Sequence, residues 1–126
     1  MAAHDGTFHA MTIILYGIRN CDTVKKARAW LDARGVAYAF HDYKIAGIDA
    51  ATLRAWATCV GWEKLLNRAG TTFRALADAD KVDLDESKAM ALMVANPSLI
   101  KRPVLTGAIE APLVGFSAAA YEAALP

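Results

Sequence analysis

The sequence has few of the features that mark several common classes of protein. Its two cysteines, Cys21 and Cys59, are too few for a disulfide framework. The formal net charge of +1 at pH 7 creates no long-range field that would attract nucleic acid or an anionic membrane. No apolar run approaches the roughly 20 residues that span a bilayer, and there is no glycine-rich phosphate loop. We therefore expect a protein that binds neither nucleic acid nor a membrane.

The N-terminal segment has neither the basic nor the apolar part of a secretory signal. We therefore expect a cytoplasmic protein whose cysteines are both thiols. Met11 directly precedes the first apolar run, so residues 1–10 are predicted to be a disordered extension. A chain of 126 residues is long enough for one hydrophobic core and too short for two. The predicted domain covers residues 11–126 and is expected to be a monomer.

Metal and aromatic sites are also poorly represented. The three histidines, His4, His9 and His41, have no metal-ligand spacing with the cysteines, so we expect no metal and no bound cofactor. The three tryptophans are predicted to be core and surface aromatics rather than a stacking platform for bases.

The first forty residues of the predicted domain indicate a β-α-β unit. Residues 12–17 are β-branched and aromatic, which is typical of a buried strand. Apolar residues then recur at helical spacing over 22–34, and Gly35 supplies a C-terminal stop. Alternating apolar residues over 36–41 predict a second strand, parallel to the first.

The middle of the chain is predicted to be helical. Asp49 is a cap for a helix that ends at Gly61 and carries Cys59 on its apolar face. Residues 62–82 indicate short helical turns, with Thr71 or Thr72 as a cap. Asp83 or Asp85 begins another helix, which Asn96-Pro97 ends.

The C-terminal part returns to strand-like patterns. Residues 103–105 predict a short strand, Thr106-Gly107 a tight turn and residues 108–111 the returning strand. Ser117 is a cap for a last helix through Leu125. The element order β-α-β, helices, β-β-α predicts an α/β fold with a mixed sheet.

Cys21 is the main candidate for chemistry because it lies at the predicted junction of a strand and a helix. Backbone N–H groups and the helix dipole favour a thiolate there, and Arg19, Lys25 and Lys26 add positive charge nearby. Asp22 acts against this, because an adjacent carboxylate raises a thiol pKa. The alternative is that Cys21 is a small buried hydrophobic residue, as free cysteines often are.

The chain has no local partner for a Cys21 disulfide. Val24 stands where a Cys-x-x-Cys motif has its second cysteine, so a partner thiol must come from elsewhere. Cys59 is a remote candidate, but its position beside Trp56 and Val60 favours a core residue. A small thiol such as glutathione is the simpler partner.

Two segments carry a resemblance to a known family. The run from Gly17 to Ala27, GIRNCDTVKKA, and the run from Lys101 to Leu105, KRPVL, resemble the ArsC/Spx family, and most of all its YffB branch. The likeness extends from about Met11 to the C-terminus. It implies a thioredoxin-like fold with a helical insertion between the two halves.

The resemblance also implies roles for individual residues. Cys21 corresponds to the family's nucleophile, and Thr23 and Lys25 match loop positions that hold an anion in arsenate reductases. Arg102 matches the anion-binding arginine, and Pro103 matches a cis-proline that faces the cysteine. Together with Arg19 and Asn20 in the loop, these residues form the predicted substrate or anion site.

The sequence departs from the arsenate reductases at two further arginines. One aligns at or near Glu63, whose charge would repel an arsenate dianion, and the other falls in 111–115, which contains no arginine. Arg68 and Arg74 are possible replacements. Val24 removes the local dithiol switch of Spx-type regulators.

The sequence therefore favours a monothiol oxidoreductase in which Cys21 attacks an oxidised thiol or an oxyanion. Glutathione or a glutaredoxin-like reductant then resolves the adduct, with Arg102 or Lys25 pairing with a carboxylate of glutathione. Two alternatives stay open. One is a glutaredoxin-coupled arsenate reductase, and the other is a non-catalytic, Spx-like module that binds another protein.

Overall fold

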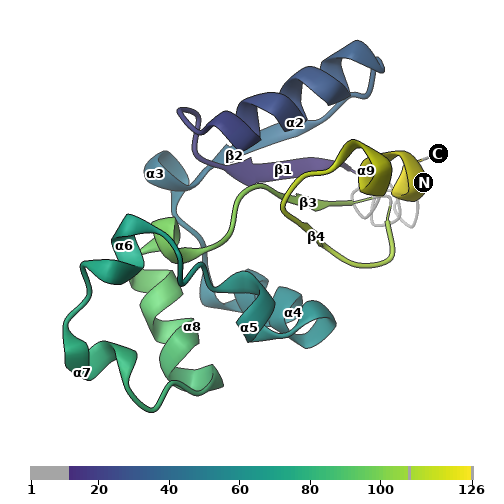
Figure 1. Ribbon diagram of the computed structural model, residues 1–126. Helices are drawn as coiled ribbons and strands as arrows, with labels where there is room; N and C mark the ends of the chain where they lie inside the picture. The colour runs from purple at the N-terminus through teal and green to yellow at the C-terminus, as the bar shows by residue number, and fades with distance from the viewer. Residues whose placement is uncertain (1–11, 108, 126) are drawn as a thin grey trace. The chain divides into compact units, whose positions relative to one another are not determined.

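A mixed four-stranded sheet is the centre of one of the two units into which the chain divides (Figure 1). The computed structural model describes residues 12–107 and 109–125. The first unit contains the described residues up to 42 together with those from 102 onward, and the second contains 43–101. The predicted extension 1–10 lies outside the described residues, and a single domain over 11–126 stays a prediction.

The strands of the first unit have the order β2-β1-β3-β4. β1 (Ile14–Gly17) pairs in parallel with β2 (Ala39–Asp42) and antiparallel with β3 (Val104–Thr106). β4 (Leu113–Val114) pairs antiparallel with β3. The predicted α/β fold with a mixed sheet is thus confirmed, including the parallel connection from β1 to β2.

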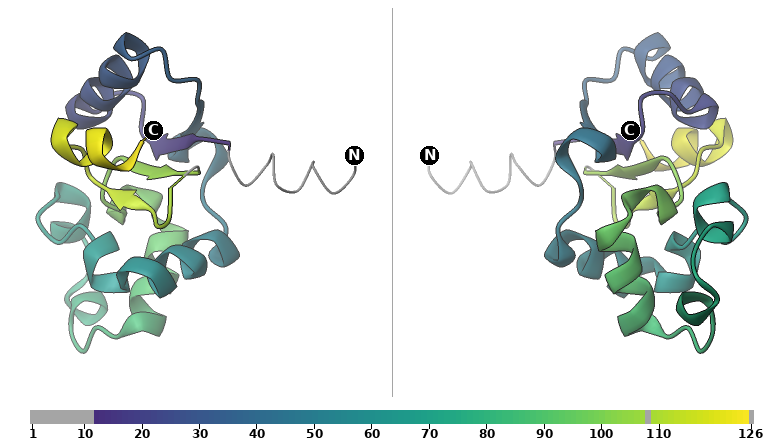
Figure 2. Two further views of the ribbon diagram at one scale, coloured as in Figure 1. Left: turned by 90° about the vertical axis from the view of Figure 1, so that its right-hand side faces the viewer. Right: turned by 90° about the vertical axis from the view of Figure 1, so that its left-hand side faces the viewer.

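Two helices, α2 (Asp22–Ala33) and α9 (Ala118–Ala124), cover the same face of this sheet (Figure 2). The predicted apolar stripe of α2 forms the helix side of the core, and its three buried residues are Val24, Ala27 and Leu31. They pack with Leu15 of β1, Leu105 of β3 and Tyr121 of α9, all fully buried. Ser117 caps α9 as predicted, since its hydroxyl accepts a hydrogen bond of 3.0 Å from the N–H of Ala120.

The bounds of all four strands differ from the prediction, and two strands, β2 and β4, begin three or more residues later than expected. β2 starts at Ala39 rather than at Val36, because the Val36 N–H donates to the Leu31 carbonyl and so completes the end of α2. The expected alternation nevertheless persists, since Val36, Tyr38 and Phe40 all pack against the core. The returning strand is Leu113–Val114 instead of 108–111, of which residue 108 lies outside the described residues. A longer loop therefore follows the turn.

Gly107 is required for the turn that leaves β3. Its φ of +87° lies in the region that favours glycine, and a Cβ there would stand 1.8 Å from the carbonyl oxygen of Thr12. The predicted tight turn at Thr106-Gly107 is nevertheless wrong, because Thr106 is the last residue of β3 and β4 begins only at Leu113.

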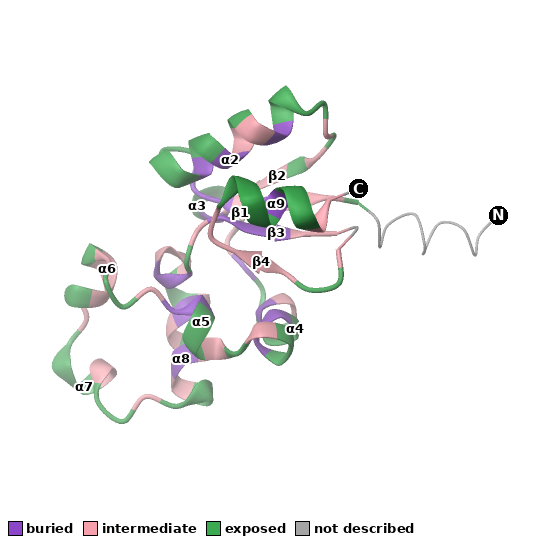
Figure 3. Ribbon diagram, turned by 45° about the vertical axis from the view of Figure 1, so that its right-hand side comes forward, coloured by how far each residue is buried: buried purple, intermediate pink, exposed green. Residues whose placement is uncertain are grey.

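The helices α3 to α8 lie between β2 and β3 in the chain and belong to the second unit, as the predicted insertion requires. They are α3 (Tyr43–Ala46), α4 (Ala50–Val60), α5 (Trp62–Leu65), α6 (Thr71–Arg74), α7 (Asp78–Lys81) and α8 (Glu86–Ala95), and a 3₁₀ turn (Pro97–Leu99) follows. Apolar side chains from α4, α5, α8 and the 3₁₀ turn are buried in this unit (Figure 3), among them Leu53, Leu65, Met93 and Leu99. No helix within the described ranges is long and apolar enough to cross a membrane.

The helix caps of the second unit follow the sequence at two positions. Asp49 accepts from the Thr52 N–H at 2.7 Å, and Asp85 accepts from the Lys88 N–H at 2.8 Å. Of the two alternatives for α8, Asp85 is therefore the cap. At α6 the prediction is wrong, because Gly70 occupies the cap position and Thr71 is already helical.

The prediction that Cys59 is a core residue is also wrong, because its side chain is exposed. The buried residues of α4 are Leu53, Trp56 and Ala57. At roughly 100° per residue, Cys59 lies on the flank of this stripe. Its apolar neighbours in the sequence therefore gave a misleading signal.

Tyr121 provides a test of how the core of the first unit is stabilised. Its ring makes edge-on contacts with Trp30 and Phe116, at centroid distances of 5.6 and 4.8 Å. Its hydroxyl is buried and has no hydrogen-bond partner among the described residues. Burial raises the pKa of Tyr121 above its usual value. The ring therefore stabilises the fold, whereas the hydroxyl costs free energy.

We predict that Tyr121→Phe leaves the free energy of unfolding unchanged or raises it by about 1 kcal/mol. Tyr121→Ala should lower it by about 3–5 kcal/mol. Because the folded-state pKa is raised, the wild type should lose stability as the pH rises above about 10, the pKa of an unfolded tyrosine. Tyr121→Phe should remove this contribution. Urea unfolding at pH 7 and pH 10.5 measures both effects, and a clear loss of stability in Tyr121→Phe at pH 7 would contradict the assignment.

Candidate functional site

Cys21 is the N-cap residue of α2, immediately after the short loop that leaves β1. Its backbone is extended, with φ −132° and ψ 126°, and its carbonyl accepts the first helical hydrogen bond from the Lys25 N–H at 2.9 Å. Its side chain is partly buried. The thiol therefore lies at the positive end of the α2 dipole, which favours a thiolate.

Gly17 allows the helix to approach the strand closely. A Cβ at Gly17 would stand 2.7 Å from Cγ2 of Val24, which is fully buried. The first turn of α2 thus packs directly on the end of β1. This contact holds Cys21 near the C-terminal end of β1.

The surroundings of Cys21 favour its thiolate. Partial burial is the largest single influence and by itself raises the thiol pKa. The N–H of Val24, a hydrogen bond from the Arg102 side chain, the N–H of Thr23 and the charge of Arg102 all act in the opposite direction. Together they outweigh burial, so the pKa of Cys21 lies below its ordinary value.

The pairing of β3 with β1 explains why Arg102 reaches Cys21. Tyr16 of β1 is opposite Val104 of β3, and the two strands are antiparallel (Figure 1). Arg102 therefore lies beside the loop that continues from β1 toward Cys21. Its Nε is buried, and the Arg102–Pro103 peptide bond is cis, as the family resemblance implies. Arg102 and Pro103 thus lie beside the C-terminal end of β1, from which the chain continues to Cys21.

The other predicted site residues are near Cys21 in the chain, but their side chains are not among the influences on its pKa. Arg19, Asn20, Thr23 and Lys25 are all exposed. Among the described residues, Arg102 is the charged group that lowers the pKa of Cys21. Thr23 contributes through its backbone N–H rather than its hydroxyl.

The opposing effect that the sequence suggested for Asp22 has no counterpart in the structure. Asp22 is exposed in the first turn of α2 and is not among the influences on the Cys21 thiol. Its carboxylate instead lies where it complements the positive end of the helix dipole.

Val24 is the contributor that sequence reasoning did not single out. Its N–H is the largest of the influences that lower the thiol pKa. Any residue other than proline supplies this N–H, so its identity carries no signal. The general expectation that helix-start N–H groups favour a thiolate is what could have indicated it.

The two positions at which the family has further arginines fall in the second unit, at or near Glu63, and in the segment 111–115, which includes β4. Glu63 is exposed in α5. The Arg68 guanidinium lies 5.7 Å from the Trp62 ring, and Arg74 donates to the Ala69 carbonyl at 2.9 Å. Their part in anion binding stays a prediction. No group of three metal-ligating side chains occurs among the residues the structure describes.

A family model and two curated relatives match this chain over most of its length. The model of the ArsC family matches residues 16–124. A Haemophilus influenzae protein without a characterised function is 42% identical over 112 residues, covering 89% of this chain and 97% of that protein. The global transcriptional regulator Spx of Streptococcus agalactiae is 30% identical over 95 residues, covering 74% of this chain and 69% of the regulator.

Solved structures extend the same relationship to the fold. A YffB protein is 60% identical with a TM-score of 0.87, and the match covers 91% of this chain and all of that one. An arsenate reductase-related protein from Brucella melitensis is 52% identical with a TM-score of 0.69, covering 90% and 93% of the two chains. These relatives support a thioredoxin-like fold and, at the level of the family, a thiol-dependent oxidoreductase. With 109 consecutive residues, 16–124, matched by the family model, this chain belongs to the ArsC family.

Proposed function

We propose that this protein is a glutathione-dependent monothiol reductase with Cys21 as its nucleophile. The observation that carries the proposal is the position of Cys21 at the start of α2 with Arg102 beside it, an arrangement that lowers the thiol pKa despite partial burial. A lowered pKa increases the fraction of reactive thiolate at neutral pH. A cysteine with a purely structural role has no need of a hydrogen bond from an arginine.

The first step is an exchange at an oxidised sulfur. The Cys21 thiolate attacks the glutathione sulfur of a mixed disulfide, R–S–S–glutathione. The new bond joins Cys21 to glutathione, and the R-thiolate leaves and takes a proton from water. The N–H groups of Thr23 and Val24 stabilise the Cys21 thiolate. They therefore also favour its release as the leaving group in the second step.

The second step needs a thiol from outside the site. The unit that contains Cys21 has no other cysteine among its described residues, because Val24 occupies the position of a second local thiol. The thiolate of a second glutathione molecule attacks the mixed disulfide and releases oxidised glutathione and the Cys21 thiolate. The net reaction converts R–S–S–glutathione and one added glutathione thiol into R–SH and oxidised glutathione, with Cys21 regenerated as the thiolate.

Arg102 has two roles in the proposed reaction. It holds the Cys21 thiolate before the reaction, and it is an anchor for a carboxylate of glutathione once the thiolate has become a neutral disulfide sulfur. A guanidinium binds a carboxylate through two parallel hydrogen bonds. The exposed Lys25 and Arg19, close to Cys21 in the chain, add positive charge that favours an anionic substrate.

Arsenate reduction is the second candidate, because a relative that is 52% identical is described as related to arsenate reductase. The family resemblance aligns an arginine at or near Glu63, and a carboxylate does not favour an arsenate dianion. The Spx relative points to a third outcome, a binding module that works without a reactive thiol. The measurements below separate the three.

The first prediction concerns the reactivity of Cys21. In a Cys59→Ser background, the pH dependence of iodoacetamide alkylation should give a pKa below about 8.5, the value of a free cysteine. Arg102→Gln should raise this pKa, because it removes both a hydrogen bond to the thiolate and a positive charge. Arg19→Gln is the matched control and should leave the pKa unchanged. An ordinary pKa that ignores Arg102 would favour the binding module over the reductase.

The second prediction concerns the choice of thiol. Wild-type protein should reduce glutathione mixed disulfides with glutathione more efficiently than with cysteamine, which has no carboxylate. Arg102→Gln should raise the KM for glutathione about tenfold, as expected for the loss of one charged hydrogen-bonded pair. The KM for cysteamine should stay within about twofold.

Arsenate provides the discriminating control in the same assay. The proposed reductase should oxidise glutathione in the presence of a mixed disulfide when no arsenate is added. Turnover that appears only when arsenate and glutaredoxin are both added would instead identify an arsenate reductase. Equal losses for glutathione and cysteamine in Arg102→Gln would remove the carboxylate-anchoring role.

A further inference from the structure

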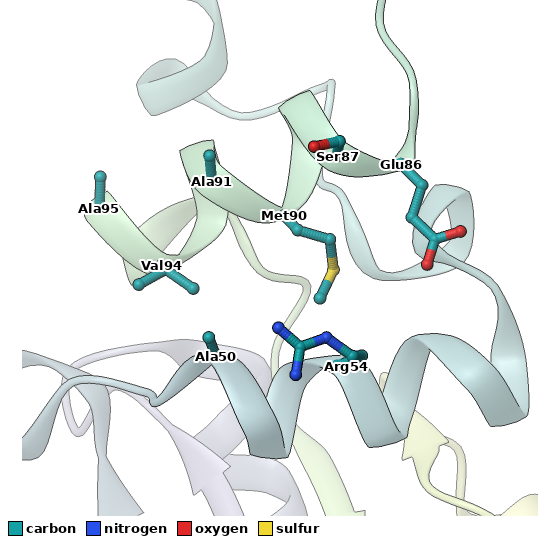
Figure 4. A pocket seen from close by; sticks show the side chains of 8 residues that line it. All are labelled: Ala50, Arg54, Glu86, Ser87, Met90, Ala91, Val94 and Ala95. Carbon is teal, nitrogen blue, oxygen red and sulfur yellow. The ribbon is translucent and has the colours of Figure 1, made fainter.

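The second unit contains a groove that the proposed reaction at Cys21 does not use. It lies between α4 and α8 and has a volume of about 680 Å³. Figure 4 shows Met90 and Val94 projecting from α8 toward α4, where Ala50 and the side chain of Arg54 face them. This volume falls within the range of about 300–1,000 Å³ in which proteins hold small molecules.

Most of the groove wall is apolar, and small side chains keep it open. Ala91 and Ala95 of α8 and Ala50 of α4 contribute only methyl groups. Met90 adds a flexible thioether that adapts to the shape of a bound group. The groove therefore offers an apolar surface to a narrow hydrocarbon chain.

Two charged side chains line the groove without neutralising each other. Within residues 12–107 and 109–125, neither the Arg54 guanidinium nor the Glu86 carboxylate forms an ion pair. Glu86 is the first residue of α8, where a carboxylate stabilises the positive end of the helix dipole. Arg54 is in the N-terminal half of α4, where the dipole gives a cation no advantage.

Arg54 is exposed on the groove wall, so its charge is available to a ligand. Glu86 has a structural reason for its position, whereas the Arg54 side chain extends between the two helices beside apolar residues (Figure 4). The natural complement of a guanidinium is a carboxylate, which it binds in a bidentate manner. We propose that the groove binds a small monocarboxylate with an apolar chain, the carboxylate on Arg54 and the chain along Met90 and Val94.

The size of the groove favours such a ligand over a protein. The groove volume of about 680 Å³ lies in the range of small-molecule sites. The charge of Glu86 also limits the ligand to one negative charge, because a second carboxylate near the start of α8 would be repelled.

Octanoate is a suitable probe, and uncharged octanamide is its match. Titration of either into the ¹⁵N-labelled full chain, followed by NMR, measures both affinity and location. Octanoate should bind saturably and shift the amide signals of α4 and α8. Octanamide should bind about tenfold more weakly, because it cannot form the charge-assisted pair with Arg54.

Two substitutions test the charged and the apolar part of the groove, and a third is a control outside it. Arg54→Gln should weaken octanoate about tenfold, whereas Arg68→Gln, which removes an exposed charge outside the groove, should have no effect. Ala91→Leu keeps the charge and suits a helix, but it fills the groove and should also weaken octanoate about tenfold. All three positions are exposed, so the fold should be retained.

Glu86 separates a carboxylate site from a site for a zwitterion. Glu86→Gln should strengthen octanoate binding about twofold, because it removes a like charge. If 2-aminooctanoate binds more tightly than octanoate and Glu86→Gln weakens it, the groove takes a zwitterion and the proposal is wrong. Octanoate binding that is unsaturable, or unchanged by Arg54→Gln, would equally overturn it.

Discussion

The antiparallel pairing of β3 with β1 is the constraint on which the Cys21 site depends. Cys21 and Arg102 are about eighty residues apart in the chain, and no local structure could bring them together. Because Tyr16 is opposite Val104, the residues that precede β3 meet those that follow β1. A shift of this register by one residue would move Leu105 out of the core and Arg102 away from the thiol at the same time. Folding stability and the chemical environment of Cys21 thus rest on one set of hydrogen bonds.

Packing of α2 on β1 provides the second half of the site. Gly17 leaves room for Val24, and burial of Val24 fixes the first turn of the helix at the end of the strand. The backbone N–H of the same residue is the strongest favourable influence on the Cys21 thiolate. The side chain of Val24 is therefore a core residue and its main chain a part of the site. Replacing the second cysteine of a dithiol motif by valine keeps the electrostatic support for a thiolate and removes the local resolving thiol.

Those parts of the structure that depend on short-range patterns could be predicted from the sequence. The stripe of Val24, Ala27 and Leu31 and the caps Asp49, Asp85 and Ser117 follow from spacing and from the hydrogen-bonding capacity of one side chain. Features that depend on longer-range contacts could not. The start of β2 depends on a bond from Val36 back to Leu31, and the exposure of Cys59 depends on which face of α4 the rest of the unit covers. Arg102 beside Cys21 was expected only from family resemblance, since a strand register across the insertion leaves no trace in the intervening residues.

In the proposed reduction, the charge of Arg102 is balanced by the Cys21 thiolate before the first exchange and by a carboxylate of glutathione after it. In the reduced protein, Arg102 bonds the thiolate and lowers its pKa. Formation of the mixed disulfide removes that negative charge, which leaves a partly buried guanidinium with more to gain from a carboxylate. A lower thiol pKa also reduces intrinsic nucleophilicity, so further stabilisation of the thiolate would slow attack while favouring release. Stabilisation of the thiolate by Arg102 is therefore a compromise between attack in the first step and release in the second. The same arginine supports the leaving thiolate in the resolving step and is available to the incoming carboxylate between the two steps.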